Sequence, residues 1–305
     1  MKPKTTNLLL LSALSIAVSL AMLGAPAFAQ NGSGIVKTNT KVLYHNGPVM
    51  QGTSAVYLIW YGNWATERPG NNGWTIGVIT DLVSNLGSSP YFRINTLYPD
   101  GSGTSPSGGL IYAGAVNDSY SHGPTLTVSD IQGVVSQQLA SGSLPLDTAG
   151  IYVVLASSDV TDIYPNSNTY CTPPFAPPHH GVGSFSGTLF KYAFIGNPAR
   201  CPTIAASQFF VPGGSTLMSP NDDIYADAIA STLAHALSIV VSNPTGTAWF
   251  DRYGLENATK CQGKFGETYP SANGSPANMR LGQRDYLIQQ NWVNVRRGYC
   301  GLSYP

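Results

Sequence analysis

Residues 222–261 read DDIYADAIASTLAHALSIVVSNPTGTAWFDRYGLENATKC, and the rest of the chain is organised around this stretch. Its acidic opening favours a helix N-terminus, because carboxylates complement the positive end of the helix dipole. Apolar residues then recur at helical spacing as far as Val241, and Asn243-Pro244 ends the pattern. The stretch therefore predicts a long core helix.

One ionisable residue, His235, lies in the middle of the apolar run. The spacing is similar to metal-binding HExxH or HExxE helices, where the histidine binds zinc, the next residue is a glutamate base and a second ligand follows one turn later. Ala236 and Ile239 occupy those two positions here, and neither can bind a metal or accept a proton. Two interpretations stay open: a zinc ligand, or a neutral, hydrogen-bonded core histidine.

A second histidine motif, His179-His180, lies in a stretch rich in Pro, Gly, Ser and Asn, residues 157–187, where periodicity is lost. A loop of that length inside a compact domain is usually functional or mobile. The pair could supply zinc ligands to a site shared with His235, or it could simply be solvated. The pattern predicts a loop and leaves both roles open.

Two further groups are candidates for sugar chemistry. Asp251 and Glu256 follow the predicted helix, and a carboxylate pair can perform acid/base work on a glycosidic bond. Trp64 lies in a Gly-Asn-Trp-Ala loop after an apolar strand. We expect it to be exposed and able to offer its ring to a sugar.

The N-terminus predicts the compartment. Two lysines precede an apolar run from Leu8 to Leu23, and Ala27-Phe-Ala gives the small-x-small pattern that signal peptidase reads. We therefore predict a signal peptide over residues 1–29, cleavage before Gln30, and a secreted single domain over residues 30–305.

Composition limits the class of partner. Charged residues make up 10% of the chain and balance to a net charge of zero, with no basic cluster beyond Arg296-Arg297. A nucleic-acid partner is therefore not expected. No later apolar run approaches the length that crosses a bilayer, so no membrane anchor is expected. We expect an extracellular or cell-wall ligand, whose identity the sequence leaves open.

A secreted protein can carry disulfides and N-linked glycans, and this chain has four cysteines and four glycosylation sequons. An even cysteine count predicts two disulfides, for which three pairings exist. Sequence order and loop size favour Cys171 with Cys201 and Cys261 with Cys300. In a eukaryotic source the Asn-x-Ser/Thr sequons are candidate glycosylation sites, at Asn31, Asn117, Asn257 and Asn273.

Hydrophobic periodicity predicts the remaining elements. Continuous apolarity over residues 54–61 predicts a central strand buried on both faces. The other expected strands are 91–98, 110–116, 151–156 and 189–196, and the other expected helices are 74–86 and 129–139. Alternation of strands and helices predicts an α/β domain with a mixed sheet and packed helices.

Several segments, in the same order along the chain, resemble the EXORDIUM or phosphate-induced protein family. They are Tyr44-His-Asn-Gly-Pro-Val-Met, the strand ending at Trp64, Lys191-Tyr-Ala-Phe-Ile-Gly-Asn-Pro-Ala-Arg-Cys-Pro202, Ser242-Asn-Pro244, Ala248-Trp-Phe-Asp251, Glu256-Asn-Ala-Thr-Lys-Cys261 and Leu287-Ile-Gln-Gln-Asn-Trp-Val-Asn294. The resemblance implies a secreted cell-wall or apoplastic protein, associated in plants with growth and cell expansion, with no established biochemical activity.

The resemblance is closer to non-plant members of the family. Such relatives often show His-Glu-Leu and a further acidic residue where this chain has His235-Ala236-Leu237, which makes that helix zincin-like. Only His235 matches here. We therefore predict a non-enzymatic EXORDIUM-like protein with a zincin-like core helix. Two alternatives stay open: a zinc-dependent hydrolase using His235 with His179 and His180, and a carbohydrate-binding wall protein using Trp64.

Overall fold

The computed structural model describes residues 41–67, 72–163, 178–201, 211, 214 and 218–305. All of them belong to one compact unit, Gly34–Pro305. The predicted signal peptide over residues 1–29 lies outside the described residues.

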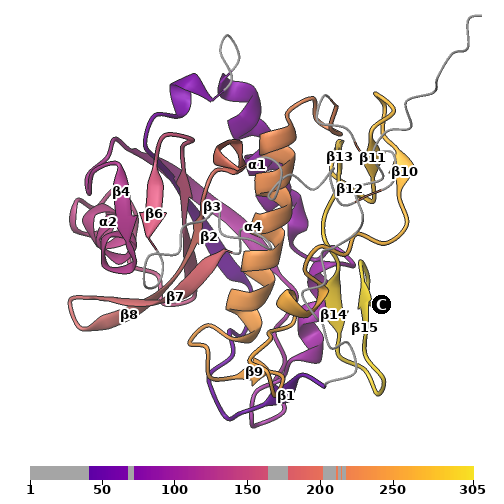
Figure 1. Cartoon of the computed structure of the whole chain (residues 1–305). Helices are drawn as coiled ribbons and strands as arrows, with labels where there is room; N and C mark the ends of the chain where they lie inside the picture. Colours follow the sequence, from indigo (N-terminus) through magenta and orange to yellow (C-terminus); the bar gives the residue numbers. More distant parts are fainter. Residues whose placement is uncertain (1–40, 68–71, 164–177, 202–210, 212–213, 215–217) are drawn as a thin grey trace, which may run out of the picture. The chain divides into compact units, whose positions relative to one another are not determined.

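A five-stranded sheet lies at the centre of this unit (Figure 1). Its order is β3 (Leu110–Asp118), β2 (Ser54–Tyr61), β5 (Gly150–Ala156), β8 (Thr188–Ile195) and β7 (His179–Phe185). The first four strands run parallel to their neighbours, and β7 is antiparallel to β8 at the edge. The predicted α/β architecture with a mixed sheet is confirmed.

Every residue of β2 is buried, as its continuous apolar sequence predicts. Successive side chains of a strand point to opposite faces. Val56, Leu58 and Trp60 therefore enter one core with helices α1 (Asn72–Leu86) and α4 (Ile224–Ser242). The alternate residues of β2 enter a second core with helix α2 (Val128–Ala140) on the other face.

Two local predictions are wrong. Residues 91–98 do not form a strand, because Phe92–Leu97 form the 3₁₀ helix η2. Just before this helix, the Ser89 hydroxyl accepts a hydrogen bond from the Phe92 amide at 3.1 Å. Helix α2 is capped by Thr127 rather than by Ser129. Thr127 and Asp130 form a reciprocal capping box, in which each side chain binds the other's backbone N–H.

The stretch 157–187 is not a continuous loop. Residues Thr161–Ile163 form β6, and His179–Phe185 form β7. Gly183 lies opposite Phe190, and a Cβ at Gly183 would lie 2.2 Å from that ring. The glycine that indicates a loop in the sequence instead admits an aromatic ring from the neighbouring strand.

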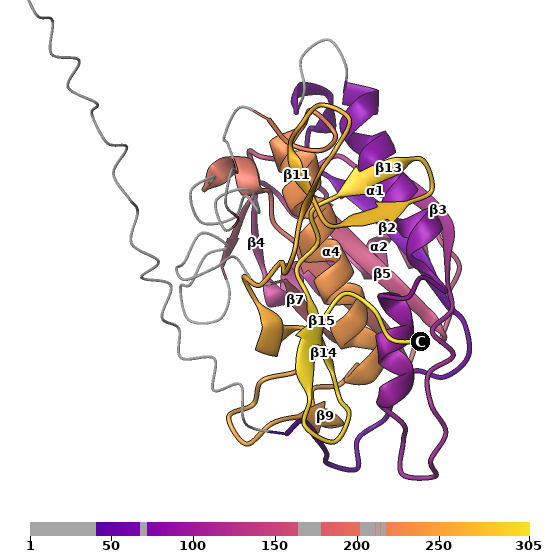
Figure 2. The ribbon, with the colours of Figure 1, turned by 90° about the vertical axis from the view of Figure 1, so that its right-hand side faces the viewer.

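The remaining elements are short. Paired strands are β1 (Leu43–Tyr44) with β9 (Trp249–Phe250), β4 (Thr125–Thr127) with β6, β10 (Tyr269–Pro270) with β11 (Pro276–Ala277), β12 (Met279–Leu281) with β13 (Arg284–Tyr286), and β14 (Asn291–Val293) with β15 (Tyr299–Gly301). Within the described residues, the other 3₁₀ helices are η1 (Trp64–Thr66), η3 (Pro198–Arg200) and η5 (Thr259–Cys261). Figure 2 shows the C-terminal strands passing along α4.

The C-terminal segment is fixed covalently. Cys261 and Cys300 form a disulfide, which confirms one of the two predicted pairings. The other pairing stays a prediction, because Cys171 lies outside the described residues. The disulfide joins the segment that follows α4 to the last strand of the chain.

Helix α4 begins and ends as its sequence predicts. The Asp223 side chain caps it by accepting from the Ala226 amide at 3.0 Å, and the helix ends at Asn243, before Pro244. By length and composition it could span a membrane, so the expectation that no apolar run after the leader reaches that length is wrong. However, 83% of its most apolar window is buried inside the protein. Such burial is typical of a core helix.

Candidate functional site

Helix α4 places His235 in the protein core, with 2% of its surface exposed. The Gln289 side-chain amide lies against Nδ1, and Nε2 lies 3.4 Å from Thr259 Oγ1. Burial, followed by the nearby His180, lowers the pKa of His235 to about 3. His235 is thus a neutral imidazole with both ring nitrogens engaged.

The residues around His235 do not fit a zinc site. Ala236 is fully buried and Ile239 nearly so, so the two positions that would carry a base and a second ligand are filled by hydrocarbon. Within the described residues no group of three His, Cys, Asp or Glu side chains could hold a metal ion. A zinc site needs at least three such ligands.

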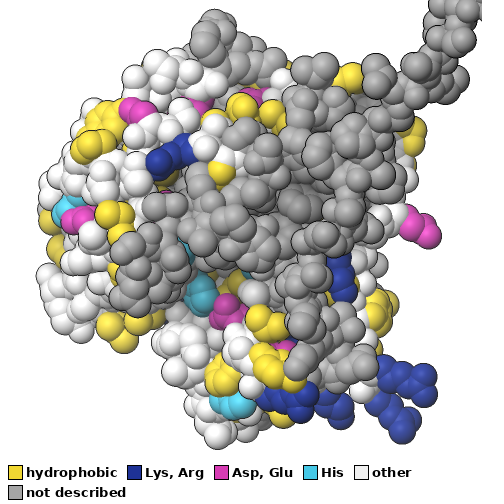
Figure 3. Space-filling view, viewed as in Figure 1, with side chains coloured by type: hydrophobic (Ala, Val, Ile, Leu, Met, Phe, Trp, Pro, Cys, Tyr) yellow, Lys and Arg dark blue, Asp and Glu magenta, His cyan; other side chains and the backbone are white. Residues whose placement is uncertain are grey.

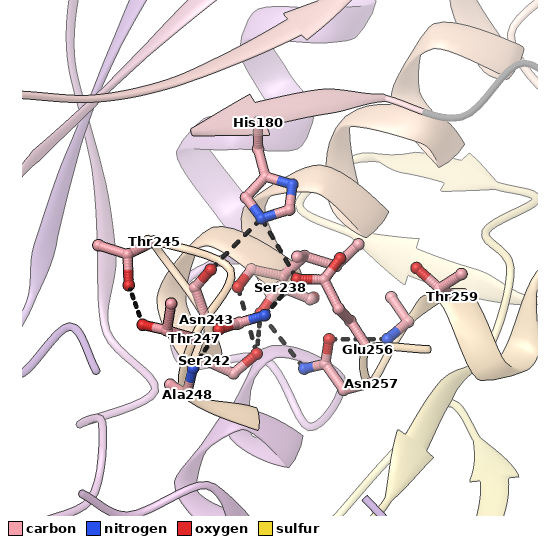
Figure 4. Close-up of polar contacts among 12 residues, drawn as sticks. His180, Ser238, Ser242, Asn243, Thr245, Thr247, Ala248, Glu256, Asn257 and Thr259 are labelled. Carbon is pink, nitrogen blue, oxygen red and sulfur yellow. Dashed lines mark hydrogen bonds and ion pairs between the residues drawn. The ribbon is translucent and has the colours of Figure 1, made fainter. Parts of the chain in front are cut away.

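A second polar cluster lies at the C-terminal end of α4 (Figure 4). His180, from strand β7, points onto Glu256, with Nε2 3.2 Å from the carboxylate Oε1 and 3.3 Å from the Asn243 carbonyl. The Asn243 amide donates to the same Glu256 oxygen at 2.6 Å. The edge strand of the sheet is thereby joined to the segment that follows the helix.

Glu256 changes the pKa of His180. Burial lowers the pKa of His180, but the hydrogen bond and the negative charge of Glu256 together outweigh burial and raise the pKa above its usual value. Both side chains keep some exposure, 15% for His180 and 16% for Glu256. Figure 4 shows Nδ1 on the side of the ring away from Glu256. A carboxylate-held imidazole of this kind can accept or deliver a proton.

His179 points to the other face of β7, as strand alternation requires. Its Nε2 lies 3.0 Å from Asp162 Oδ2, and its ring stacks on Phe194 with centroids 5.9 Å apart. The structure therefore brings His180 close to His235 but turns His179 away from both. A site shared by the three histidines does not form.

Asp251 and Glu256 do not act as a carboxylate pair. Asp251 is fully buried and lies 2.9 Å from the ammonium group of Lys260, which is also fully buried. Glu256 binds His180 instead. The two carboxylates therefore have separate electrostatic partners: Asp251 pairs with Lys260 in the core, and the largely buried Glu256 pairs with His180.

The expected exposure of Trp64 is wrong. Its side chain is buried, and its indole Nε1 lies 3.2 Å from the carbonyls of Tyr61 and Leu155. The ring also packs edge-on against Trp60. Trp64 therefore closes the carboxyl ends of β2 and β5, and its ring is not available to a sugar.

The sequons differ in accessibility. Asn117 is exposed on β3, and Asn273 is half-buried, with its amide donating to the Ser219 carbonyl at 2.8 Å. Asn257 is fully buried and bonded to Asn95 Oδ1 at 3.2 Å. Asn31 lies outside the described residues.

Sequence reasoning missed the partners of both histidines. Gln289 and Thr259 hold His235, and Asn243 orients Glu256. In the sequence, Asn243 indicates only the end of a helix. All three lie in segments that carry the family resemblance, which is the signal that could have pointed to them.

Comparison with known proteins supports the family resemblance that these segments carry. Residues 42–286 match the family model described as the phosphate-induced protein 1 conserved region. Protein EXORDIUM-like 3 of Arabidopsis thaliana is 30% identical over 287 residues, covering 85% of this chain and 82% of that protein. Protein EXORDIUM-like 5 of the same plant is 31% identical over 274 residues, covering 82% of this chain and 74% of that protein.

A tobacco relative extends the comparison. Protein PHOSPHATE-INDUCED 1 of Nicotiana tabacum is 26% identical over 260 residues, covering 77% of each chain. No solved structure matches the chain. The matched residues include α4, His180 and Glu256. The chain therefore belongs to the phosphate-induced protein 1 family, together with the EXORDIUM-like proteins.

Proposed function

We propose that the mature chain is a secreted EXORDIUM-like protein that acts by binding, without catalysis, at the cell surface or in the cell wall. Family membership and the signal-peptide pattern support the location. The observation that carries the non-enzymatic part is the apolar packing of Ala236 and Ile239 beside a neutral His235. In plants, the family's link with growth and cell expansion gives the biological setting.

The packing around His235 favours a structural role for this histidine. A catalytic zinc site keeps three protein ligands and one open position, with a base close to the metal-bound water. Here Gln289 and Thr259 engage the two imidazole nitrogens, and neither neighbouring helix position carries a donor atom. At the two positions that a zinc helix uses for its base and second ligand, α4 therefore carries no donor group.

A zinc measurement tests the proposal. We expect mature protein beginning at Gln30, dialysed against zinc and then against metal-free buffer, to retain far less than one zinc per chain by plasma mass spectrometry. The physical reason is that the residues that the structure describes offer no group of three His, Cys, Asp or Glu ligands for zinc.

Two matched variants keep this test decisive. One zinc per chain in the wild type, lost in both His235→Gln and His180→Asn, would overturn the non-enzymatic proposal. Far-UV circular dichroism of each variant separates loss of a ligand from loss of the fold. His179→Asn is the control, because its ring is directed to Asp162.

A second candidate function rests on the His180–Glu256 pair. A histidine that is held by a carboxylate, keeps a small exposed fraction and has a raised pKa is suited to general acid/base chemistry without a metal. This candidate is a hydrolase in which His180 moves the proton and Glu256 and Asn243 position the ring. It does not require His235 to touch substrate.

The two candidates differ in one measurement. If the binding proposal holds, hydrolysis of a panel of glycoside, ester and peptide substrates stays at the buffer rate for both wild type and His180→Asn. Turnover by the wild type that falls about 100-fold or more in His180→Asn, within the usual range for loss of a general base, would establish the hydrolase. Glu256→Gln should then show a shifted pH profile.

A further inference from the structure

The acidic and basic residues are distributed unequally along the chain. All 15 acidic residues lie between Glu67 and Asp285. Outside that span the mature chain carries cations only, at Lys37, Lys41, Arg296 and Arg297. The two ends of the mature chain are therefore locally positive, although the mature chain has more acidic than basic residues.

The fold brings described parts of these two ends together. Asn294, at the start of the turn between β14 and β15, donates from its side-chain amide to the Val42 carbonyl at 3.2 Å, next to Lys41. Arg296 and Arg297 lie at the exposed end of the same turn. We call Lys41, Arg296 and Arg297 the basic tip. Figure 3 shows Lys and Arg side chains gathered at the lower right of this face.

The basic tip stands on a rigid base. Cys300, on β15, is bonded to Cys261 and lies opposite Trp292 in the hairpin register. Gly298, in the left-handed region with φ of 60°, packs so closely that a Cβ would lie 2.1 Å from the Trp292 ring. The Lys260 ammonium lies 4.7 Å from the centroid of that ring. The turn is therefore held in place before any partner arrives, which lowers the entropy cost of binding.

The charges of the basic tip are not neutralised within the described part of the chain. None of its three residues forms an ion pair there, whereas Lys260, Arg280 and Arg284 each pair with an aspartate. Tyr299 lies beside the turn with 51% of its surface exposed. The tip thus combines guanidinium groups, which bind carboxylates through two parallel hydrogen bonds, with an aromatic ring.

We infer that the basic tip binds a linear polysaccharide that carries carboxylate groups. The guanidinium groups fit uronate carboxylates, and Tyr299 offers a ring face for a sugar. Three cations are few for a nucleic-acid footprint, which relies on many phosphate contacts. The choice of a polysaccharide over other polyanions rests on the proposed extracellular location. The site is separate from the polar cluster at the end of α4.

Binding to polygalacturonate tests this inference. We expect the wild type to bind at low salt, to lose affinity as salt is raised, and to ignore neutral amylose. Arg296→Gln/Arg297→Gln should bind about tenfold more weakly, because it removes two exposed Arg–carboxylate contacts. Lys191→Gln/Arg280→Gln is the control, since it changes the net charge equally on strands β8 and β12 and should bind like the wild type.

Three outcomes would overturn the inference: equal binding by the wild type and the tip variant, equal loss in the control, or binding to amylose as tight as to polygalacturonate. Tighter binding to duplex DNA or to phosphatidylserine vesicles at the same salt would also reject a polysaccharide partner. None of these outcomes bears on zinc content or hydrolysis, so failure here is distinguishable from failure of the proposed function.

Discussion

Asp251→Ala is expected to lower the free energy of unfolding by about 3–5 kcal/mol, the range for removing one partner of a buried ion pair. Asp251 and Lys260 are both fully buried, with 2.9 Å between the ammonium nitrogen and the carboxylate. The substitution leaves the Lys260 charge in the core, where water cannot solvate it. Urea unfolding at pH 7, followed by circular dichroism, measures the loss.

The position of this pair makes the effect large. Asp251 also accepts hydrogen bonds from the Tyr253 and Leu255 amides, at 2.9 and 3.0 Å, and so organises the turn after β9. Lys260 lies under the Trp292 ring and next to the disulfide cysteine, Cys261. Removing the carboxylate therefore disturbs the turn and the base of the β14–β15 hairpin together.

Two controls separate the buried charge from general damage. Arg280→Ala breaks an ion pair whose arginine is 57% exposed, and it should cost less than about 1 kcal/mol. Asp251→Ala/Lys260→Met removes both charges, and we expect it to be more stable than Asp251→Ala alone. A double variant less stable than the single one would contradict the explanation.

Local sequence patterns correctly predicted the elements in which the apolar residues of the pattern are the residues that the fold buries. The apolar runs of β2 and β5 are buried on both faces, and α4 begins at its acidic residues and ends before Pro244. Strand β7 was missed because its histidines and glycines have low strand propensity, and it is held instead by pairing with β8. Trp64 was misplaced because its loop turns back over two strand ends, which only tertiary structure reveals.

The candidate site was predicted in its residues but not in its pairings. Local sequence identified both His235 and Glu256 as candidates. However, Glu256 pairs with His180, which lies 76 positions earlier in the chain. Such a contact depends on the order of strands in the sheet. One sequence contains no local signal for it, and for the same reason Gln289 was not linked to His235.

Acid should destabilise the protein through His235. Its folded-state pKa of about 3 lies below the value of about 6.5 for an unfolded histidine, so folding favours the neutral ring. The resulting stabilisation is complete above pH 6.5 and is lost as the pH falls toward 3. The difference between the two pKa values corresponds to a total loss of about 5 kcal/mol, of which about 3 kcal/mol falls between pH 6.5 and pH 4. Urea unfolding of the wild type and of His235→Gln between pH 8 and pH 4 measures it.

The wild type must be compared with His235→Gln because other groups titrate in the same pH range and change the stability in the opposite direction. Burial raises the pKa of Asp227 to about 6, so its stabilising contribution is present below about pH 4 and is lost as the pH rises through 6. His180, whose raised pKa reflects Glu256, likewise stabilises at low pH and loses that contribution as the pH rises. Both contributions are largely common to wild type and variant.

The difference in stability between wild type and His235→Gln therefore isolates His235. We expect His235→Gln to be the less stable protein at pH 7, because glutamine fills the site without matching both hydrogen bonds to Gln289 and Thr259. Below pH 6.5 the gap should narrow, since only the wild type must take up a proton to unfold. Parallel stability curves would contradict a neutral buried ring. So would an NMR titration in which the His235 ring protons shift near pH 6.5, because an imidazole held neutral by the core keeps constant shifts down to pH 4.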